Sequence, residues 1–369
     1  MLKLQRIAGQ AFCSAALLLA LGVLSWQRAG TFRSEETLWA DTAAKDPDST
    51  TAHYNLAVEL ERLGRNDEAN LHYRRVLEIN PRYTNARVNL AMLIWNAGRV
   101  DEALAEVREA LAGNPKSGEA YNALGFILLK NGREDEATAA FKTATEVSPL
   151  LAKPHLMYGE RLLQKGEVDQ AVLELGTAMN LDSSIFQVYY DMGVAFTRKG
   201  SLDLAIAAFQ KSLEIDPGSV EAYDNLGQLL IQKGDMNAGV VQYQKALEIN
   251  SKSAMTETDL GAALFQAGLK EEAMKHLRAA LELDPALVQA NSNLGNALLA
   301  TGQVDAAIAQ YQKTVQLNPA FADVRRNLGV ALMMKGRAAD AVVQLKEAVR
   351  LNPNDRVAQQ LLDKAQGKH

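Results

Sequence analysis

Residues 222–249 read AYDNLGQLLIQKGDMNAGVVQYQKALEI. Tyr223, Leu226 and Leu230 recur at the three- and four-residue spacing of one apolar helix face, and the same spacing returns after Gly234. Glycine is typical of the left-handed residue that ends a helix, so we predict two helices of similar length that meet at Gly234. This stretch therefore predicts a helical hairpin.

Two series of residues repeat this hairpin along the chain at intervals of 34 residues. The first series consists of turn glycines: Gly64, Gly98, Gly132, Gly166, Gly200, Gly234, Gly268, Gly302 and Gly336. The second series lies 17 residues away and consists of prolines, which cannot continue a helix. Its members are Pro47, Pro81, Pro115, Pro149, Pro217, Pro285, Pro319 and Pro353, and Ser183 and Ser251 occupy the two remaining positions. A period of this size indicates a repeat array.

Small residues recur where the two helices of a hairpin would approach each other. They lie seven residues before the turn glycine in five repeats, at Gly193, Gly227, Gly261, Gly295 and Gly329. Large residues such as Phe209 and Tyr243 are expected to fill the gap between successive hairpins. Gly176 and Gly239 depart from the pattern, and the fourth and sixth units lack proline, so we expect these two units to be the least stable.

The pattern resembles the tetratricopeptide repeat (TPR), in the motifs AYDNLG at residues 222–227 and YQKALEI at residues 243–249. The resemblance covers residues 50–355 as nine units without insertion. It implies an all-α fold, a right-handed α-solenoid of nine TPR hairpins. We also expect a linking half-repeat over residues 31–49, with Ser34 as a helix N-cap, and a polar capping helix over residues 356–369 that completes the array.

The N-terminal residues 1–30 are predicted to form a membrane anchor. Residues 7–26 contain no charged side chain and, as a helix, would extend roughly 30 Å, the thickness of a bilayer core. Basic residues lie on both sides and Trp26 suits the membrane interface. A cleaved signal peptide is the alternative interpretation. An anchor would place the protein in a membrane as a single-pass protein, in a bacterial inner membrane with the repeats outside the cytoplasm.

The composition argues against several other classes of function. The net charge of -5 offers no basic stripe for nucleic acid, and the one cysteine, Cys13, allows neither an intrachain disulfide nor a CxxC site. The five histidines do not follow a metal-binding spacing, and we expect them on solvated helix surfaces. The sequence carries no phosphate loop or nucleophile elbow, so we predict that the protein is not an enzyme and needs no cofactor.

A polar position recurs one residue before a large apolar residue, leucine in seven of the nine units, in each first helix. Asn or Asp occupies it at Asn55, Asn89, Asp191, Asn225, Asp259, Asn293 and Asn327, whereas Ala123 and Met157 interrupt the series. This series resembles the asparagine ladder of O-linked N-acetylglucosamine transferase. The resemblance implies that these residues, with Tyr189 and Tyr223, bind a protein or peptide in a concave groove, since an amide both donates and accepts. Alternatively, Asn-Leu-Gly is merely common in this repeat and Asn caps local polar groups.

Three functions are compatible with these features. The first is a membrane-anchored scaffold that binds protein segments in its groove and supports assembly of a complex. The second is a non-catalytic, substrate-presenting subunit of a membrane glycosyltransferase system, because the chain also resembles the carboxy-terminal part of the transmembrane-and-TPR mannosyltransferases without their catalytic region. The third is self-association into a homo-oligomer, which no feature of the sequence specifically indicates.

Overall fold

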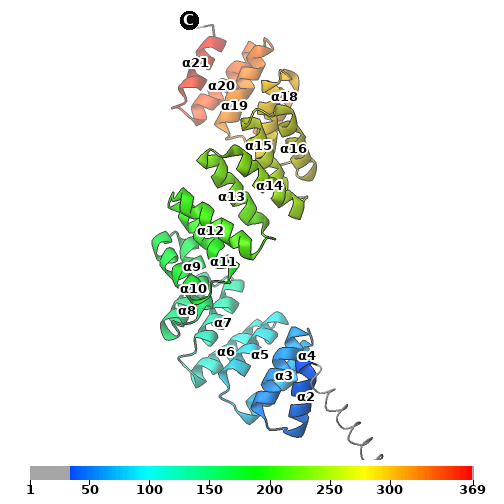
Figure 1. The fold of residues 1–369 in the computed structure, drawn as a ribbon. Helices are drawn as coiled ribbons and strands as arrows, with labels where there is room; N and C mark the ends of the chain where they lie inside the picture. Colours follow the sequence, from blue (N-terminus) through cyan, green and yellow to red (C-terminus); the bar gives the residue numbers. More distant parts are fainter. Residues whose placement is uncertain (1–33, 368–369) are drawn as a thin grey trace, which may run out of the picture. The chain divides into compact units, whose positions relative to one another are not determined.

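The computed structural model describes residues 34–367, and every regular element in that range is an α-helix, with no strand (Figure 1). The membrane anchor expected at residues 7–26 lies outside the described residues. Within the described range, no helix is both long enough and apolar enough to cross a bilayer.

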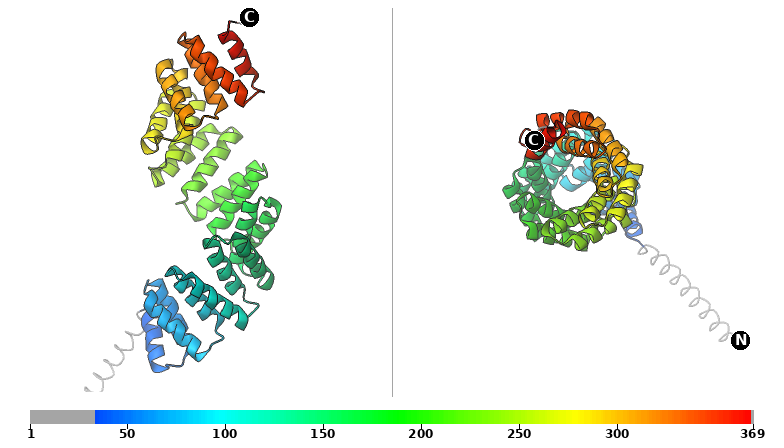
Figure 2. Two further views of the ribbon diagram at one scale, coloured as in Figure 1. Left: turned by 180° about the vertical axis from the view of Figure 1, so that it is seen from behind. Right: turned by 90° about the horizontal axis from the view of Figure 1, so that it is seen from above.

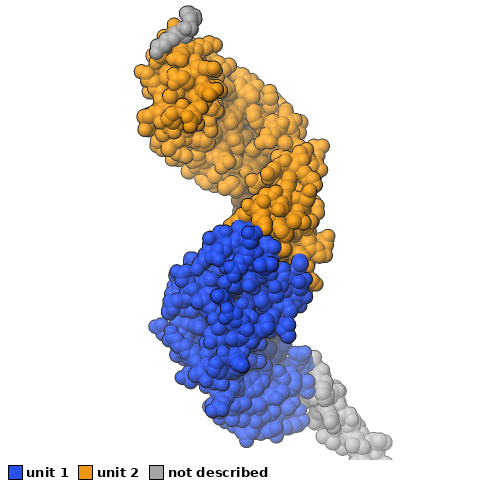
Figure 3. Space-filling model, turned by 90° about the vertical axis from the view of Figure 1, so that its left-hand side faces the viewer, with its two compact units in different colours: residues 1–182 blue, residues 183–369 orange. Residues whose placement is uncertain are grey.

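The chain divides into two compact units, one ending at Asp182 and the other beginning at Ser183 (Figure 3). In the first unit, α2 precedes four hairpins: α2 (Glu35–Lys45), α3 (Thr50–Arg62) with α4 (Asn66–Ile79), α5 (Thr84–Asn96) with α6 (Val100–Gly113), α7 (Gly118–Lys130) with α8 (Glu134–Val147), and α9 (Ala152–Lys165) with α10 (Val168–Leu181). Helix α2 packs on α3 and begins at the predicted N-cap, where the Ser34 hydroxyl accepts the Thr37 N–H at 3.2 Å.

The second unit contains five hairpins and one further helix (Figure 1, Figure 2). Its helices are α11 (Phe186–Arg198) with α12 (Leu202–Ile215), α13 (Val220–Lys233) with α14 (Met236–Ile249), α15 (Ala254–Gln266) with α16 (Lys270–Leu283), α17 (Val288–Ala300) with α18 (Val304–Leu317), α19 (Ala322–Met334) with α20 (Ala338–Leu351), and α21 (Arg356–Ala365). In both units the odd-numbered helices from α3 to α19 are the first helices of hairpins.

The turn glycines end the first helices as the sequence predicts. All nine have a left-handed backbone, with φ between 70° at Gly336 and 98° at Gly234. At Gly234 the following N–H, of Asp235, donates to the carbonyl of Leu230 at 2.9 Å, which satisfies an acceptor at the helix end. The hairpin spacing therefore follows from the one residue type that adopts this conformation without strain.

Glycine in the first helix lets the two helices of a hairpin approach closely. A Cβ atom added to Gly193 would lie 2.8 Å from three ring atoms of Phe209. The Phe209 ring is 1% exposed and belongs to an apolar cluster with Leu213 and Leu226, which continues into the next hairpin. Each hairpin thus buries its apolar side only when it is stacked on a neighbour.

The expectation that the histidines lie on solvated surfaces is wrong for the described ones. His53 and His155 are buried, at 8% and 7% exposure, and His276 is half-buried. These histidines are buried because a pair of polar residues, 19 positions apart in sequence, joins the two helices of several hairpins. Its members are His53–His72 at 2.9 Å, Arg87–Glu106 at 2.8 Å, His155–Glu174 at 2.6 Å, Glu257–His276 at 2.7 Å and Arg325–Gln344 at 2.9 Å.

Successive first helices also contact one another within each unit. Helix α7 contacts α5 and α9 in the first unit, and α17 contacts α15 and α19 in the second. We call the surface that carries Asn55, Asn89 and their equivalents in successive first helices the first-helix face. It is the surface on which the candidate binding residues lie.

Candidate functional site

The residues of the predicted polar series all lie on first helices, each next to a largely buried residue. Six of them are half-buried, and Asp191 is 7% exposed. Ala123 and Met157 take the same position on α7 and α9, so the interruption of the series is a feature of the first unit. The series therefore presents polar groups beside the apolar core rather than fully in solvent.

The side-chain amide of Asn89 has a fixed orientation. Its Nδ2 donates to the hydroxyl oxygens of Tyr73 and Tyr54, at 3.1 and 3.3 Å. The Tyr73 hydroxyl donates its one proton to Glu61 Oε2 at 2.9 Å, so it can only accept from Asn89. Burial is the main reason why the pKa of Tyr73 is raised, which keeps this hydroxyl protonated. The Asn89 carbonyl oxygen is therefore the group left for a partner.

The same orientation recurs in the second unit. The Nδ2 of Asn225 donates to the Tyr190 hydroxyl at 3.3 Å and to the Glu221 carbonyl at 2.8 Å. The Nδ2 of Asn327 donates to Asn296 Oδ1 at 3.1 Å, and that oxygen also accepts the Tyr311 hydroxyl at 2.7 Å. The amide nitrogen therefore links neighbouring residues, and the carbonyl oxygen remains an acceptor.

Asn55 and Asn293 differ from these three residues. Among residues 34–367, neither side chain makes a hydrogen bond, and both are half-buried on their first helices. Removing their amides would therefore leave the hydrogen-bond network of the repeats intact. This difference makes them the better probes of a binding role.

The acidic members of the series lie in the second unit. Asp191 Oδ1 accepts a hydrogen bond from Gln187 at 3.1 Å on the same helix. Burial, reinforced by the Asp224 carboxylate, raises the pKa of Asp259 to about 6. The pKa of Asp224 is also raised by burial, against the effect of the Thr256 hydroxyl, which donates to its Oδ2 at 2.9 Å. This part of the face therefore holds carboxyl groups that are costly to ionise.

The predicted aromatic residues Tyr189 and Tyr223 lie near second helices. Lys245 of α14 places its Nζ 5.6 Å from the centre of the Tyr223 ring. The pKa of Lys211 on α12 is raised mainly by its hydrogen bond to Glu214 and more weakly by Tyr189. Neither tyrosine makes a hydrogen bond to an amide of the series among the described residues.

Two other tyrosines accompany the amides, and the sequence interpretation missed them. They are Tyr54 and Tyr190, each of which accepts the amide of the asparagine 35 residues later, Asn89 or Asn225. The signal that could have identified them is this recurrent spacing of one repeat plus one residue. It places the tyrosine one position before the polar series in the preceding first helix.

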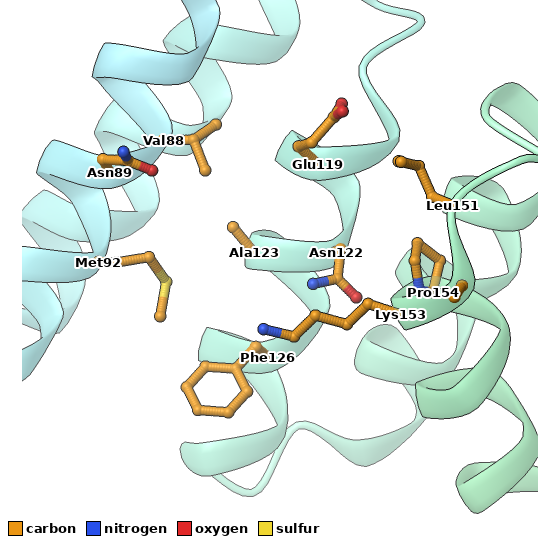
Figure 4. Close-up of a pocket in the computed structure, with 11 residues that line it drawn as sticks. Val88, Asn89, Met92, Glu119, Asn122, Ala123, Phe126, Leu151, Lys153 and Pro154 are labelled. Atoms are coloured by element: carbon orange, nitrogen blue, oxygen red, sulfur yellow. The ribbon is translucent and has the colours of Figure 1, made fainter. Parts of the chain in front are cut away.

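A cavity of about 450 Å³ opens on the first-helix face of the first unit, between α5, α7 and the start of α9 (Figure 4). Its apolar lining includes Val88, Met92, Ala123 and Phe126, and its polar lining includes Asn89, Glu119, Asn122 and Lys153. A second cavity, of about 360 Å³, lies in the other unit beside Tyr190 and Glu221. The first of these cavities therefore includes Ala123, where the polar series is interrupted.

The part of the chain that the structure describes forms no metal-binding site. No group of three or more His, Cys, Asp or Glu side chains is arranged there to hold a metal ion. The site on the first-helix face consists of amide carbonyls, carboxyl groups and apolar recesses. Such groups bind by hydrogen bonding and burial of apolar surface.

Comparison with protein families identifies the same type of repeat along most of the chain. Models described as tetratricopeptide repeat match residues 15–84, 60–125, 97–150 and 220–253, and a model described as TPR repeat matches residues 193–234, 261–302 and 295–336. A search of curated proteins finds no match.

Solved structures with TM-scores above 0.5 share the fold at low sequence identity. The crystal structure of the APC/C hetero-tetramer Cut9-Hcn1 has a TM-score of 0.54 at 16% identity, over 89% of this chain and 80% of that chain. Pseudomonas aeruginosa pilF has a TM-score of 0.52 at 17% identity, over 58% of this chain and 97% of that chain. YrrB, described as a TPR protein with an unusual peptide-binding site, has a TM-score of 0.43 at 23% identity, over 50% and 96%. Helices, turn glycines and family matches agree, and the chain is therefore an all-helical solenoid of tetratricopeptide repeats.

Proposed function

We propose that this protein is a membrane-anchored scaffold that binds segments of partner proteins on its first-helix face and performs no chemistry itself. The observation that carries the proposal is the oriented amide of Asn89, with its equivalents at Asn225 and Asn327. In each, the nitrogen bonds within the repeats and the carbonyl oxygen remains as an acceptor. A series of such acceptors beside apolar surface suits the N–H groups of an extended peptide.

The test compares two double variants of the full chain that differ in the face they change. Asn55→Ala with Asn293→Ala removes one amide from each unit without breaking a hydrogen bond between described residues. Asn66→Ala with Asn237→Ala is the matched control, because these exposed amides lie on the second helices α4 and α14. Partners are captured from host membranes after in-cell crosslinking and identified.

We expect the Asn55 and Asn293 variant to recover less of the partner than the wild type while its circular dichroism is unchanged. The Asn66 and Asn237 control should recover the partner in full. Equal recovery by both double variants would remove the polar series from the binding surface. If the captured partner is a polytopic glycosyltransferase, the scaffold presents substrate to that enzyme. Transferase activity of the purified chain alone would contradict a non-catalytic role.

The anchor is a separate part of the proposal and rests on the sequence of residues 7–26. It assigns the protein to a bacterial inner membrane, with the repeats outside the cytoplasm. Leu18→Arg in the full chain places a charge near the centre of this segment, at a cost of about 3 kcal/mol for a membrane-inserted helix. Membrane fractions should lose the variant and keep Leu18→Phe. Retention of both variants would contradict the anchor.

A further inference from the structure

We infer that the cavity between α5, α7 and α9 is a specificity pocket for one large apolar side chain of an extended partner segment, with an acidic side chain beside it. The inference rests on the proposed function and adds to it the chemistry that selects the segment. It concerns the first unit alone, since every lining residue lies between Val88 and Pro154.

The absence of an amide at Ala123 opens the apolar part of this pocket. In seven other repeats an Asn or Asp side chain occupies this position and in one Met157 does, whereas Ala123 leaves the space between Met92 and Phe126 open (Figure 4). The volume of about 450 Å³ lies within the range of about 300–1,000 Å³ that is usual for ligand sites. The alanine that interrupts the polar series therefore creates a recess.

The Phe126 side chain is held in place from outside the recess. Its ring meets the Trp95 ring edge to face, with centroids 5.1 Å apart. The Nζ of Lys130 lies 5.7 Å from the Phe126 centroid. A ring fixed by such contacts needs little reordering when an apolar group enters, so the recess is preformed.

Two carbonyl oxygens in the polar lining lack donors. Asn122 Oδ1 is buried and has no hydrogen-bond partner among the described residues. Asn89 Oδ1 remains an acceptor because its nitrogen bonds Tyr73 and Tyr54. The cost of about 1–3 kcal/mol for a buried acceptor without a donor applies to Asn122 Oδ1, whereas the Asn89 oxygen is accessible to a backbone N–H group of a bound segment. The acceptors therefore favour a peptide over a purely apolar ligand.

A positive side chain, Lys153, and a negative one, Glu119, line different sides of the pocket. Lys153 makes no ion pair within residues 34–367, and its side chain extends from α9 toward the recess (Figure 4). Glu119 lines the pocket from α7 and accepts the Ser117 hydroxyl at 3.1 Å. An acidic side chain of the partner is attracted to Lys153 and repelled by Glu119, so it settles at the α9 side. The partner segment is thus apolar and acidic in adjacent positions.

The test uses the full chain and an array of acetylated, amidated peptides in a Gly-Ser background. A central Leu, Phe, Ala or Lys is combined with Glu, Gln or Lys at the neighbouring position. We expect the wild type to retain the Leu–Glu and Phe–Glu peptides about tenfold better than Ala–Glu, the discrimination that an apolar pocket typically gives. Ala123→Asn should lose this preference, whereas Ala139→Asn on the exposed surface of α8 should keep it.

Lys153→Glu is the second variant, because the exposed Lys153 can be changed without disturbing the core. It should exchange the preference for Glu for a preference for Lys, and Lys275→Glu on α16 should not. Equal retention of the Leu and Ala peptides by the wild type, or unchanged preferences in Ala123→Asn and Lys153→Glu, would overturn the pocket. If the pocket variants also capture the native partner normally while the Asn55 and Asn293 variant does not, the inference fails and the scaffold function stands.

Discussion

Two glycines in the α9–α10 hairpin should respond to alanine with opposite signs. Gly159 lies in α9, and a Cβ added to it would lie 2.8 Å from Leu175 Cγ and 2.9 Å from Leu175 Cδ2. Leu175 is fully buried at 0% exposure, so its side chain has no free space to move into. Gly176 lies in α10, and a Cβ added there would meet nothing within 4 Å.

The magnitudes follow from two competing effects. Replacing a helix-interior glycine by alanine gains about 1 kcal/mol of helix propensity at either position. Overpacking of a filled core costs about 1–3 kcal/mol, and it applies only to Gly159. We therefore expect Gly176→Ala to stabilise the protein by about 1 kcal/mol and Gly159→Ala to destabilise it by about 1 kcal/mol.

Urea unfolding followed by circular dichroism measures both changes in the free energy of unfolding. Hairpins of a repeat array can unfold separately, so hydrogen exchange of α9 and α10 must show that the change arises in this hairpin. Stabilisation by both variants to a similar extent would contradict this expectation, since it would mean that Leu175 yields and that close helix approach does not require glycine here.

Three further predictions concern polar groups. Asp259→Asn should stabilise the protein at pH 7 by about 1 kcal/mol after allowance for solvent screening, because the raised pKa of Asp259 makes the free energy of unfolding fall as pH rises from about 4 through about 6. Urea titrations across this range should show this pH dependence in the wild type and not in the variant. His72 has a pKa lowered by burial and then by His53, so the first hairpin should lose stability as pH falls below about 6.5, and His72→Asn should flatten this dependence in hydrogen exchange of α3 and α4. Tyr73→Phe should lower the free energy of unfolding, measured by thermal unfolding, by about 1–2 kcal/mol, because it removes the hydroxyl between Asn89 and Glu61. Tyr121→Phe should lower it by less than about 0.5 kcal/mol, and equal losses in the two variants would count against the hydrogen-bond network around Tyr73.

The repeat itself could be predicted because its signal is local. Each turn glycine ends a helix at a fixed distance from the next, and a left-handed residue has few substitutes, so the glycine series predicts the nine turns that the structure shows. The sequence alone also placed the polar series on the first helices. Both predictions need only positions within one repeat.

The orientation of the site could not be predicted in this way, because it depends on contacts between repeats and between helices. The Asn89 amide is fixed by Tyr73, 16 residues earlier, and by Tyr54 in the preceding hairpin. His155 is buried because Glu174 lies opposite it on α10, a pairing that no metal or catalytic spacing describes. Ala123 likewise reads as a defect in a series until the neighbouring helices show that it opens a cavity.

In-cell photocrosslinking from two positions of the first unit tests most directly whether partners bind on the first-helix face. A benzophenone side chain at Met92 lies on that face, in α5, and one at Leu71 lies on the second helix α4, where the native side chain is 67% exposed. We expect a partner to be crosslinked from Met92 and not from Leu71. Crosslinking of that partner from Leu71 alone, or equally from both positions, would contradict binding on that face.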